Sequence, residues 1–328
     1  MGFILCGMSL RSMAGSLVMK RPILEMNSTL LFRYNARAFV AIAVFSCVWL
    51  ISCVDNVYGE PSTGPEAYTP LQKRLIRDGF DKSLIRSLYS RPEVVFDQQG
   101  LTAYFSHREA TLNYDQFLTP SSIDRAFDYL GRHKEAFKQT QQVYGVEDEV
   151  ITAILLVESR LGTFVGKRLV LNTLSALSAL DDKDNRDMLW RTYVRHKTQG
   201  ARSEFDKWAR RKSAWAYREL KAFLQYVAAQ KIDPYSVYGS YAGALGIAQF
   251  VPSSVLRFAQ DGNRDGLINL YDHEDAIESI ANYLKQHGWR PGLKRDEAFR
   301  TILYYNRSRY YAETILQVAE RLRNRGER

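Results

Sequence analysis

The sequence predicts a mainly α-helical protein, and two observations carry this prediction. Apolar residues recur at helical spacing in one segment after another, whereas runs of alternating apolar and polar residues are few. The composition, 46% hydrophobic and 25% charged over 328 residues, is that of a globular protein and excludes a disordered or fibrous chain. The formal net charge of +9 includes no long basic block, so we expect no nucleic acid as a partner.

An export signal is expected over residues 1–59. An uncharged apolar run at 38–54 follows two arginines and precedes polar residues, which is the order of a secretory signal. Three outcomes stay open: a lipid on Cys53 of the sequence Leu50-Ile-Ser-Cys, cleavage near residue 59, or an uncleaved anchor helix. We therefore expect an exported protein that meets a membrane only through this segment or through a lipid on Cys53.

Cysteine usage agrees with export. All three cysteines, Cys6, Cys47 and Cys53, lie inside the expected signal. The chain after them can form no disulfide and no thiolate metal site, so its stability must come from a hydrophobic core.

The rest of the chain divides into an N-terminal helical segment at 60–110 and a larger catalytic domain at 111–328. In the first, a helix is expected over 66–88 and a strand-like or irregular stretch over 93–106. A charge-rich insertion near 181–212 is expected to form one or two exposed helices. Apolar spacing predicts further helices at 122–144, 148–161, 169–180, 213–231, 275–287 and 296–323.

Glu158 is the candidate catalytic acid. Ile151 and Leu155 precede it by seven and three residues, which places Glu158 on the inward-facing stripe of a helix. Burial and the negative end of the helix dipole both disfavour a charged carboxylate there. A protonated carboxyl near neutral pH is what a general acid requires. The alternative is a buried glutamate paired with an arginine for structural reasons.

A stretch at 239–254, rich in glycine and alanine over its first part, is the second candidate. Its small side chains allow the backbone to approach a neighbour or a ligand closely. Ser240 and Gln249 are polar groups in this otherwise small, apolar stretch and suit hydrogen bonding to a sugar or an acetamido group. No Lys-Ser/Thr pair follows the last glycine, so the segment is not a phosphate loop. Tight helix packing is the alternative.

The acidic stretch at 261–275 predicts a loop of the EF-hand kind that binds calcium. Gly266 permits the sharp turn at the sixth position, and Asp272 takes the twelfth in place of the usual glutamate, so Asp275 or Glu274 would close a longer loop. The candidate ligands are the side chains of Asp261, Asn263, Asp265 and Asp275 and the carbonyl of Leu267. The alternative is a turn between helices that holds no metal.

A run of aromatic residues surrounds Asn306 between Leu303 and Tyr311. Aromatic rings next to an amide suit stacking and hydrogen bonding to sugar rings. The alternative is an aromatic core in which Asn306 serves as a helix cap.

The order and spacing of these motifs resemble the lytic murein transglycosylases, in particular the membrane-bound lytic transglycosylase B type. The resemblance rests on Glu158-Ser-x-x-Gly, on Gly-Ala-x-Gly-x-x-Gln-Phe-x-Pro-Ser-Ser at 243–254 and on Tyr305-Asn306, and it covers roughly residues 110–311. It implies a lysozyme-like helical catalytic domain, of the goose type, that carries the EF-hand-like loop.

The resemblance also implies an activity. Family members cleave the β-1,4 bond between N-acetylmuramic acid and N-acetylglucosamine in peptidoglycan without water and leave 1,6-anhydro-muramyl ends, and Glu158 matches their only acid and base. The resemblance further implies a periplasmic monomer of a Gram-negative type of bacterium, with structural Ca²⁺ and no cofactor for catalysis. The positions that match substrate-binding residues are Tyr114, Arg211, Lys212, Ser240, Gln249, Tyr283, Tyr305, Asn306 and Tyr311.

Three other functions compete with this one. A hydrolase on the same fold would use water and leave reducing ends. A non-catalytic wall-binding protein would keep the groove, but the presence of Glu158, Ser240, Gln249 and Asn306 argues against it. A calcium-dependent interaction module would normally pair two loops, and the sequence shows one.

Overall fold

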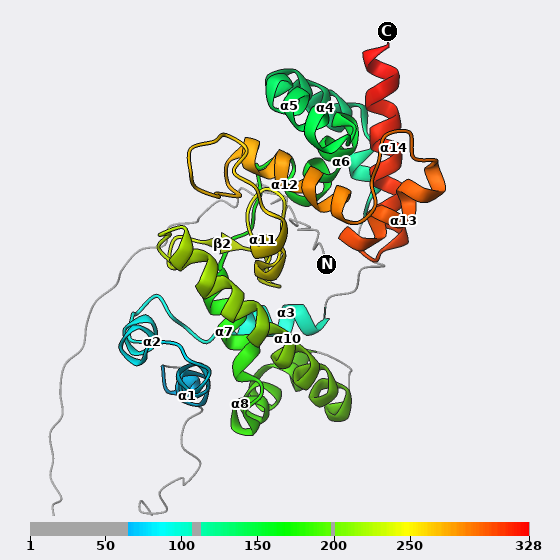
Figure 1. Ribbon diagram of the computed structural model, residues 1–328. Helices are drawn as coiled ribbons and strands as arrows, with labels where there is room; N and C mark the ends of the chain where they lie inside the picture. The colour runs from blue at the N-terminus through cyan, green and yellow to red at the C-terminus, as the bar shows by residue number, and fades with distance from the viewer. Residues whose placement is uncertain (1–64, 107–112, 198–200, 328) are drawn as a thin grey trace, which may run out of the picture. The chain divides into compact units, whose positions relative to one another are not determined.

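The mainly α-helical prediction is confirmed. The computed structural model describes residues 65–106, 113–197 and 201–327, and helices dominate these ranges (Figure 1). The expected export signal at 1–59 with its three cysteines, and the expected boundary between residues 110 and 111, lie outside the described residues. None of the helices in the described ranges is both long and apolar enough to span a bilayer.

Two very short strands accompany the helices. The strands β1 (Arg168–Leu169) and β2 (Tyr238–Gly239) pair antiparallel, with Arg168 opposite Gly239. The α-helices are α1 (Thr69–Arg77), α2 (Lys82–Tyr89), α3 (Gln98–Ser106), α4 (Pro120–Arg132), α5 (Lys134–Tyr144), α6 (Asp148–Ser159), α7 (Val170–Ala179), α8 (Lys183–Leu189), α9 (Arg195–Lys197), α10 (Arg202–Ala229), α11 (Pro252–Phe258), α12 (His273–Gln286), α13 (Arg295–Tyr305) and α14 (Arg309–Gly326). Single turns are η1 (Pro65–Tyr68), η3 (Asp115–Phe117) and the π-helical η4 (Trp190–Val194).

The stretch at 93–106, predicted to be strand-like or irregular, contains the helix α3 instead. The carboxylate of Asp97 accepts the N–H of Gly100 at 2.8 Å, so it satisfies a free donor of the first turn. Leu101 and Tyr104 are buried one turn apart, and the helix packs against α7. Residues 94–97 are irregular, as one of the two options had it, but the prediction was wrong for 98–106 because tertiary packing overrides the strand propensity of aromatic and β-branched residues.

Two predicted helices, 66–88 and 122–144, are each divided into two. The first is broken between α1 and α2, where the carboxylate of Asp81 accepts the N–H of Leu84 at 2.7 Å and begins α2. The second is broken at His133, which ends α4 and precedes α5. Apolar periodicity survives such breaks, so it locates the helical regions but not the corners between them.

The predicted helix at 296–323 is also two helices, α13 and α14. Asn306 between them has an extended backbone with φ −141°, and its side chain accepts the N–H of Ser308 at 3.0 Å. Ser308 in turn accepts the N–H of Tyr311 at 3.3 Å and begins α14. Asn306 therefore acts as a cap, which is the structural alternative considered for it.

The charge-rich region at 181–212, predicted to be exposed, is packed in large part. Leu189 and Val194 are fully buried, and α10 begins at Arg202, earlier than predicted. Phe205 and Ala209, four residues apart, are buried on the inner face of α10. The prediction of exposure was wrong because the many charged side chains obscured this apolar stripe.

The helix α6 is buried on all sides. Every residue from Val150 to Ser159 is buried, and α4, α5, α12 and α14 pack around the helix (Figure 1). A helix that is apolar on every face belongs in a core. The single inward stripe predicted for this helix therefore understates its burial.

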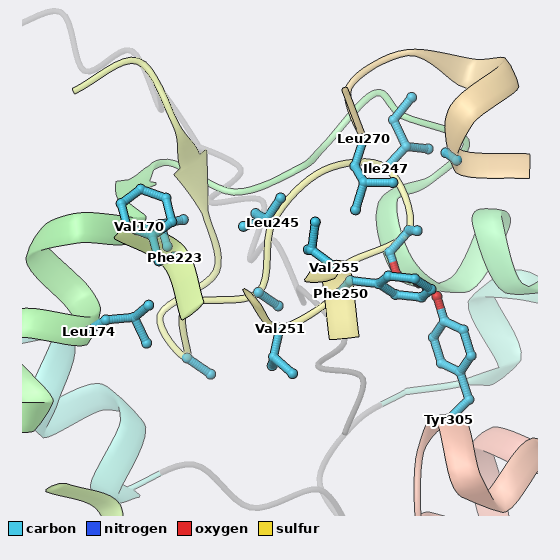
Figure 2. Packing of buried hydrophobic residues seen from close by; sticks show 14 of the residues in the cluster. Val170, Leu174, Phe223, Leu245, Ile247, Phe250, Val251, Val255, Leu270 and Tyr305 are labelled. Carbon is cyan, nitrogen blue, oxygen red and sulfur yellow. Dashed lines mark hydrogen bonds between the residues drawn. The ribbon is translucent and has the colours of Figure 1, made fainter. Parts of the chain in front are cut away.

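The glycine-rich segment at 239–251 crosses the core. Leu245 and Phe250 exchange backbone hydrogen bonds of 2.9 and 3.2 Å, and the N–H of Ile247 reaches the carbonyl of Leu270 at 2.7 Å. Figure 2 shows these apolar side chains between Val170, Leu174 and Phe223 on one side and Leu270 and Tyr305 on the other. The segment thus joins the helices α7 and α10 to the part of the core that contains Tyr305.

Candidate active site

Glu158 lies in the last turn of α6 and is 1% exposed. The helix ends one residue later, because Arg160 takes a left-handed backbone with φ 52°. The hydroxyl of Ser159 accepts the N–H of Gly162 at 2.9 Å and holds the chain as it leaves the helix. The carboxyl group therefore lies at the negative end of a core helix, as predicted.

Two tyrosines from the C-terminal part of the chain lie close to Glu158. Tyr311 of α14 and Tyr305 of α13 are both buried, and their rings are parallel with centroids 6.3 Å apart. Burial, and then the negative charge of Glu158, raise the pKa of both hydroxyls well above the ordinary value. Both hydroxyls are therefore neutral donors, and that of Tyr305 donates to the carbonyl of Ala248.

Ser240 and Gln249 are both buried in the glycine-rich segment. The Oγ of Ser240 accepts the N–H groups of Ala242 and Ala244 at 3.3 and 3.1 Å, so it shapes the turn. Gln249 has a left-handed backbone with φ 49°, which is a strained conformation for this residue type.

The side chain of Gln249 is held by its nitrogen and leaves its oxygen available. Nε2 donates to the carbonyls of Val165 and Gly246 at 3.0 and 2.8 Å. Oε1 is buried and has no hydrogen-bond partner within the described residues. Because a buried polar atom without a partner costs free energy, this oxygen is a candidate acceptor for a donor group on a ligand.

Tyr283 and Tyr114 are also buried, and each lies near one of these two tyrosines. Tyr283 donates to the carbonyl of Tyr304 at 2.7 Å and its ring lies 5.0 Å from that of Tyr305. Tyr114 is close enough to Tyr311 to raise the pKa of that hydroxyl further, although it is the smallest of the causes. Tyr283 and Tyr114 are therefore near Glu158 only indirectly, with Tyr305 and Tyr311 as the residues between.

Arg211 and Lys212 lie on α10. Arg211 is exposed, whereas Lys212 is half-buried and donates to the hydroxyl of Tyr104. Its ammonium lies 4.4 Å from the ring centroid of Tyr104 and 5.3 Å from that of Trp215. Burial, and then the charge of Arg211, lower the pKa of Lys212 to about 8. The contacts of Lys212 are therefore with aromatic side chains of α3 and α10.

The loop at 261–275 is folded around its own carboxylates. The two carboxylate oxygens of Asp261 accept the N–H groups of Asp265 and Gly266 at 3.1 and 2.9 Å. Asn263 donates to the carboxylate of Asp265 at 3.2 Å. Three predicted ligands of calcium therefore lie within one tight turn, with their oxygens close together.

Asp275 closes this loop, and Asp272 does not. Both oxygens of Asp275 are engaged by N–H groups of Gly262, Asn263 and Asn269, at distances from 2.7 to 3.3 Å. Asp272 instead caps α12, where it accepts the N–H of Glu274 at 2.8 Å. Within the described part of the chain, no three His, Cys, Asp or Glu side chains are arranged to hold a metal ion by themselves. A calcium ion here would depend on amide and carbonyl oxygens as well.

Glu219 is a buried carboxylate that sequence reasoning missed. It lies at the middle of α10, is 4% exposed, and accepts the N–H and the hydroxyl of Ser253, both at 2.9 Å. It thus caps α11, whose own N-cap residue Val251 offers no side-chain acceptor. The signal was its place between Ala216 and Phe223 on the buried face of α10.

Comparison with known proteins agrees with this arrangement. Residues 65–297, more than half of the chain, match the family described as "Transglycosylase SLT domain". The membrane-bound lytic murein transglycosylase B of Escherichia coli (strain K12) is 31% identical over 245 residues, which are 71% of this chain and 60% of that protein. The chain thus spans about 60% of the length of this relative.

Two solved structures share the fold. The soluble lytic transglycosylase SltB1 from Pseudomonas aeruginosa superposes with a TM-score of 0.64 and 26% identity, over 80% of this chain and 100% of that one. The Escherichia coli lytic transglycosylase Slt35, in complex with calcium, gives a TM-score of 0.62 and 25% identity over 82% and 96%. The lysozyme-like fold expected from the resemblance is thereby confirmed, and the chain belongs to the transglycosylase SLT domain family.

Proposed function

We propose that this protein is a lytic murein transglycosylase, a carbon–oxygen lyase acting on a polysaccharide. It would cleave the β-1,4 bond between N-acetylmuramic acid and N-acetylglucosamine in peptidoglycan without water, and leave 1,6-anhydro-muramyl ends. The observation that carries the proposal is Glu158, a buried carboxyl at the end of a core helix with the neutral tyrosines Tyr305 and Tyr311 close to it. The names of the relatives point to the same reaction.

A single acid and base is consistent with how the other buried carboxylates are used. Glu219 caps α11, Asp275 holds the loop at 261–275, and Glu278 accepts a hydrogen bond from Tyr144 at 2.9 Å. Each of these three is occupied by structural donors, so none of them is available for proton transfer. A pair of carboxylates is usual in glycoside hydrolysis, whereas the proposed reaction without water needs only one.

The proposed reaction returns its proton to the same group. Glu158 in its acid form would donate a proton to the glycosidic oxygen, and the bond from that oxygen to C1 of the muramyl sugar breaks. The leaving N-acetylglucosamine keeps this proton as its 4-hydroxyl. The Glu158 carboxylate would then take the proton of the C6 hydroxyl, whose oxygen forms the new bond to C1. No water is consumed, and Glu158 ends in the state in which it began.

The remaining site residues are proposed as substrate contacts. The free Oε1 of Gln249 suits the N–H of an acetamido group, and Ser240 lies in the same segment. Tyr305 and Tyr311 would keep the carboxyl positioned rather than stack on sugar, since both are buried. Contacts of the substrate with Tyr114, Arg211, Lys212, Tyr283 and Asn306 stay predictions.

We also propose that the loop at 261–275 binds a structural Ca²⁺ ion. The ion would be held by Asp261, Asn263, Asp265, the carbonyl of Leu267 and Asp275, a set of oxygen donors that suits calcium. It would neutralise the crowded carboxylates of the turn. The calcium in the complex of Slt35 supports this choice of metal.

The segment at 1–59 is proposed as the export signal, and Cys53 as a site of lipidation. Mass spectrometry of the mature N-terminus would separate the three processing outcomes.

The deciding experiment is a digest of purified peptidoglycan by the full chain, read by mass spectrometry. Muropeptides that end in 1,6-anhydro-muramic acid are expected, and Glu158→Gln should abolish them while the thermal unfolding temperature is retained. Reducing ends would replace the proposal by a hydrolase on the same fold. Activity retained by Glu158→Gln would remove Glu158 from its role, and no cleavage at all would favour a wall-binding protein.

A further inference from the structure

The corner between α13 and α14 presents two tyrosines inward and two outward. Tyr305 and Tyr311 are 2% and 0% exposed and lie close to Glu158. Their chain neighbours Tyr304 and Tyr310 are 61% and 69% exposed, the largest fractions among the large hydrophobic side chains of the described residues. Exposed aromatic rings beside a buried site are typical of binding surfaces.

We propose that Tyr304 and Tyr310, together with Arg307 and Arg309, form an outer binding surface for an anionic glycan strand. The ligand would be the part of the peptidoglycan strand beyond the bond that is cleaved. This inference rests on the proposed function, which identifies the glycan as peptidoglycan. The shape of the surface does not depend on the proposed function.

Tyr304 is held in place before any ligand arrives. Its ring centroid lies 5.0 Å from that of His287, which stacks at 4.2 Å on the ring of Tyr283. The hydroxyl of Tyr283 donates to the backbone carbonyl of Tyr304 at 2.7 Å. Because ring and backbone are both fixed to α12, a sugar that stacks on Tyr304 pays little entropy for ordering the side chain.

Ring contacts connect Tyr304 to the candidate active site. From Tyr304 the contacts run through His287 and Tyr283 to Tyr305, whose ring lies 5.0 Å from that of Tyr283. Tyr305 stacks on Tyr311, and the negative charge of Glu158 raises the pKa of both tyrosine hydroxyls. Ring contacts therefore link Tyr304 to the two tyrosines beside Glu158, which puts the proposed surface near the part of the chain where the strand would be cleaved.

The charge of the corner suits peptidoglycan. Arg307 and Arg309 are exposed, residues 303–312 include no acidic side chain, and neither arginine forms an ion pair within the described ranges. The guanidinium of Arg309 lies 5.2 Å over the ring of Phe299, which keeps it near the corner. The stem peptides of peptidoglycan carry free carboxylates, so two unpaired cations would attract the strand.

Binding without turnover tests the surface. The full chain with Glu158→Gln would be sedimented with purified insoluble peptidoglycan, and the bound fraction measured against polymer concentration. Tyr304→Ala and Tyr310→Ala should each weaken binding about fivefold, the order of an aromatic contact, and Tyr304→Phe should leave it unchanged. Arg307→Gln with Arg309→Gln should weaken binding at low salt, and the loss should vanish at high salt because the charges are screened.

Leu84→Ala is the matched control, because Leu84 is 58% exposed on α2. Unchanged binding in both tyrosine-to-alanine variants, or an equal loss in Leu84→Ala, would overturn the surface. Thermal unfolding of each variant identifies any loss of binding that comes from a damaged fold. Tyr310→Ala should not damage the fold, because the ring of Tyr310 is the most exposed.

The surface and the reaction fail separately. If the chain with Glu158 intact makes anhydro-muropeptides but binding ignores Tyr304 and Tyr310, only the surface is wrong. If binding depends on these tyrosines and no anhydro-muropeptides form, the surface stands and the proposed reaction is wrong.

Discussion

The glycine-rich segment at 239–251 and the acidic loop at 261–275 are built from the same kinds of turn in opposite surroundings. Each has a glycine and a non-glycine residue with positive φ: Gly246 and Gln249 in the segment, Gly266 and Arg264 in the loop. The segment is buried and packed between neighbouring elements, whereas the loop is half-buried or exposed apart from Leu270 and Asp275, and its own carboxylates accept the N–H groups of the turn. The same backbone geometry can therefore come from packing or from local hydrogen bonds, and the two should respond differently to change.

The largest difference in stability is expected when a methyl group is added to each glycine, by Gly246→Ala in the segment and Gly266→Ala in the loop. A Cβ on Gly246 would lie 2.4 Å from the Cβ and 2.6 Å from the carbonyl oxygen of Leu270, so the backbone must move. Gly246→Ala should lower the free energy of unfolding by more than about 3 kcal/mol, the upper range for overpacking. Gly266→Ala has open space, so it should cost only the strain of positive φ, about 1 kcal/mol.

Chemical denaturation of the two variants measures this pair. Equal losses would show that the two turns are not distinguished by their surroundings, and the comparison would fail.

An effect of calcium on stability is expected from the loop at 261–275 and not from the glycine-rich segment. If the loop at 261–275 binds Ca²⁺, an ion at one hundred times its dissociation constant adds about 2.7 kcal/mol to the native state. Chelation with EDTA should therefore lower the thermal unfolding temperature, and added Ca²⁺ should restore it. Asp261→Asn should make the unfolding temperature indifferent to EDTA. A melting curve of the unaltered chain that EDTA does not move would remove the metal.

The smallest effect is expected for Asp148, a carboxylate that lacks the N–H donors which the loop provides to Asp261 and Asp275. Asp148, at the start of α6, has a buried oxygen with no hydrogen-bond partner in the described part of the chain. Burial, and then Glu149 and Glu147, raise the pKa of Asp148 from 3.8 to about 6. The folded state therefore holds a proton that the unfolded chain loses first, and the resulting stabilisation, complete below pH 3.8, disappears as the pH rises through about 6.

Asp148→Asn should therefore stabilise the protein at pH 8, by about 1 kcal/mol once solvent screening of this half-buried group is allowed for. Thermal unfolding at pH 8 and pH 4 measures the effect, which should vanish at the lower pH. A gain of the same size at both pH values would mean that the charge of Asp148 is not its source.

The sequence predicted what depends on the order of residues along one helix or loop. The inward position of Glu158 followed from periodicity, and the role of Asp275 in closing the loop was one of two options that the spacing allowed. The corners at His133 and Asn306 were missed because apolar spacing continues through them. The sequence does not indicate which of two neighbouring tyrosines is buried, since Tyr304 and Tyr305 are adjacent but 61% and 2% exposed.

Contacts between distant residues were beyond the sequence. Glu219 and Ser253 are 34 positions apart, and their hydrogen bonds follow only from the packing of α11 on α10. The helix α3 was missed for the same reason, because its buried face is defined by α7. Local patterns give the elements and their polar residues, and tertiary packing decides which of those residues meet.

The residues around Glu158 come from distant parts of the chain, so they are not all present until late in synthesis. Glu158 is made in the first half of the chain, but Tyr305 and Tyr311 come near its end, and α14 packs directly on α6. A nascent chain that stops short of these residues has the carboxyl without its two tyrosine neighbours and without the helix α14 that packs on α6. If Glu158 is the catalytic acid, its surroundings are complete only after α14 has been synthesised and has packed on α6.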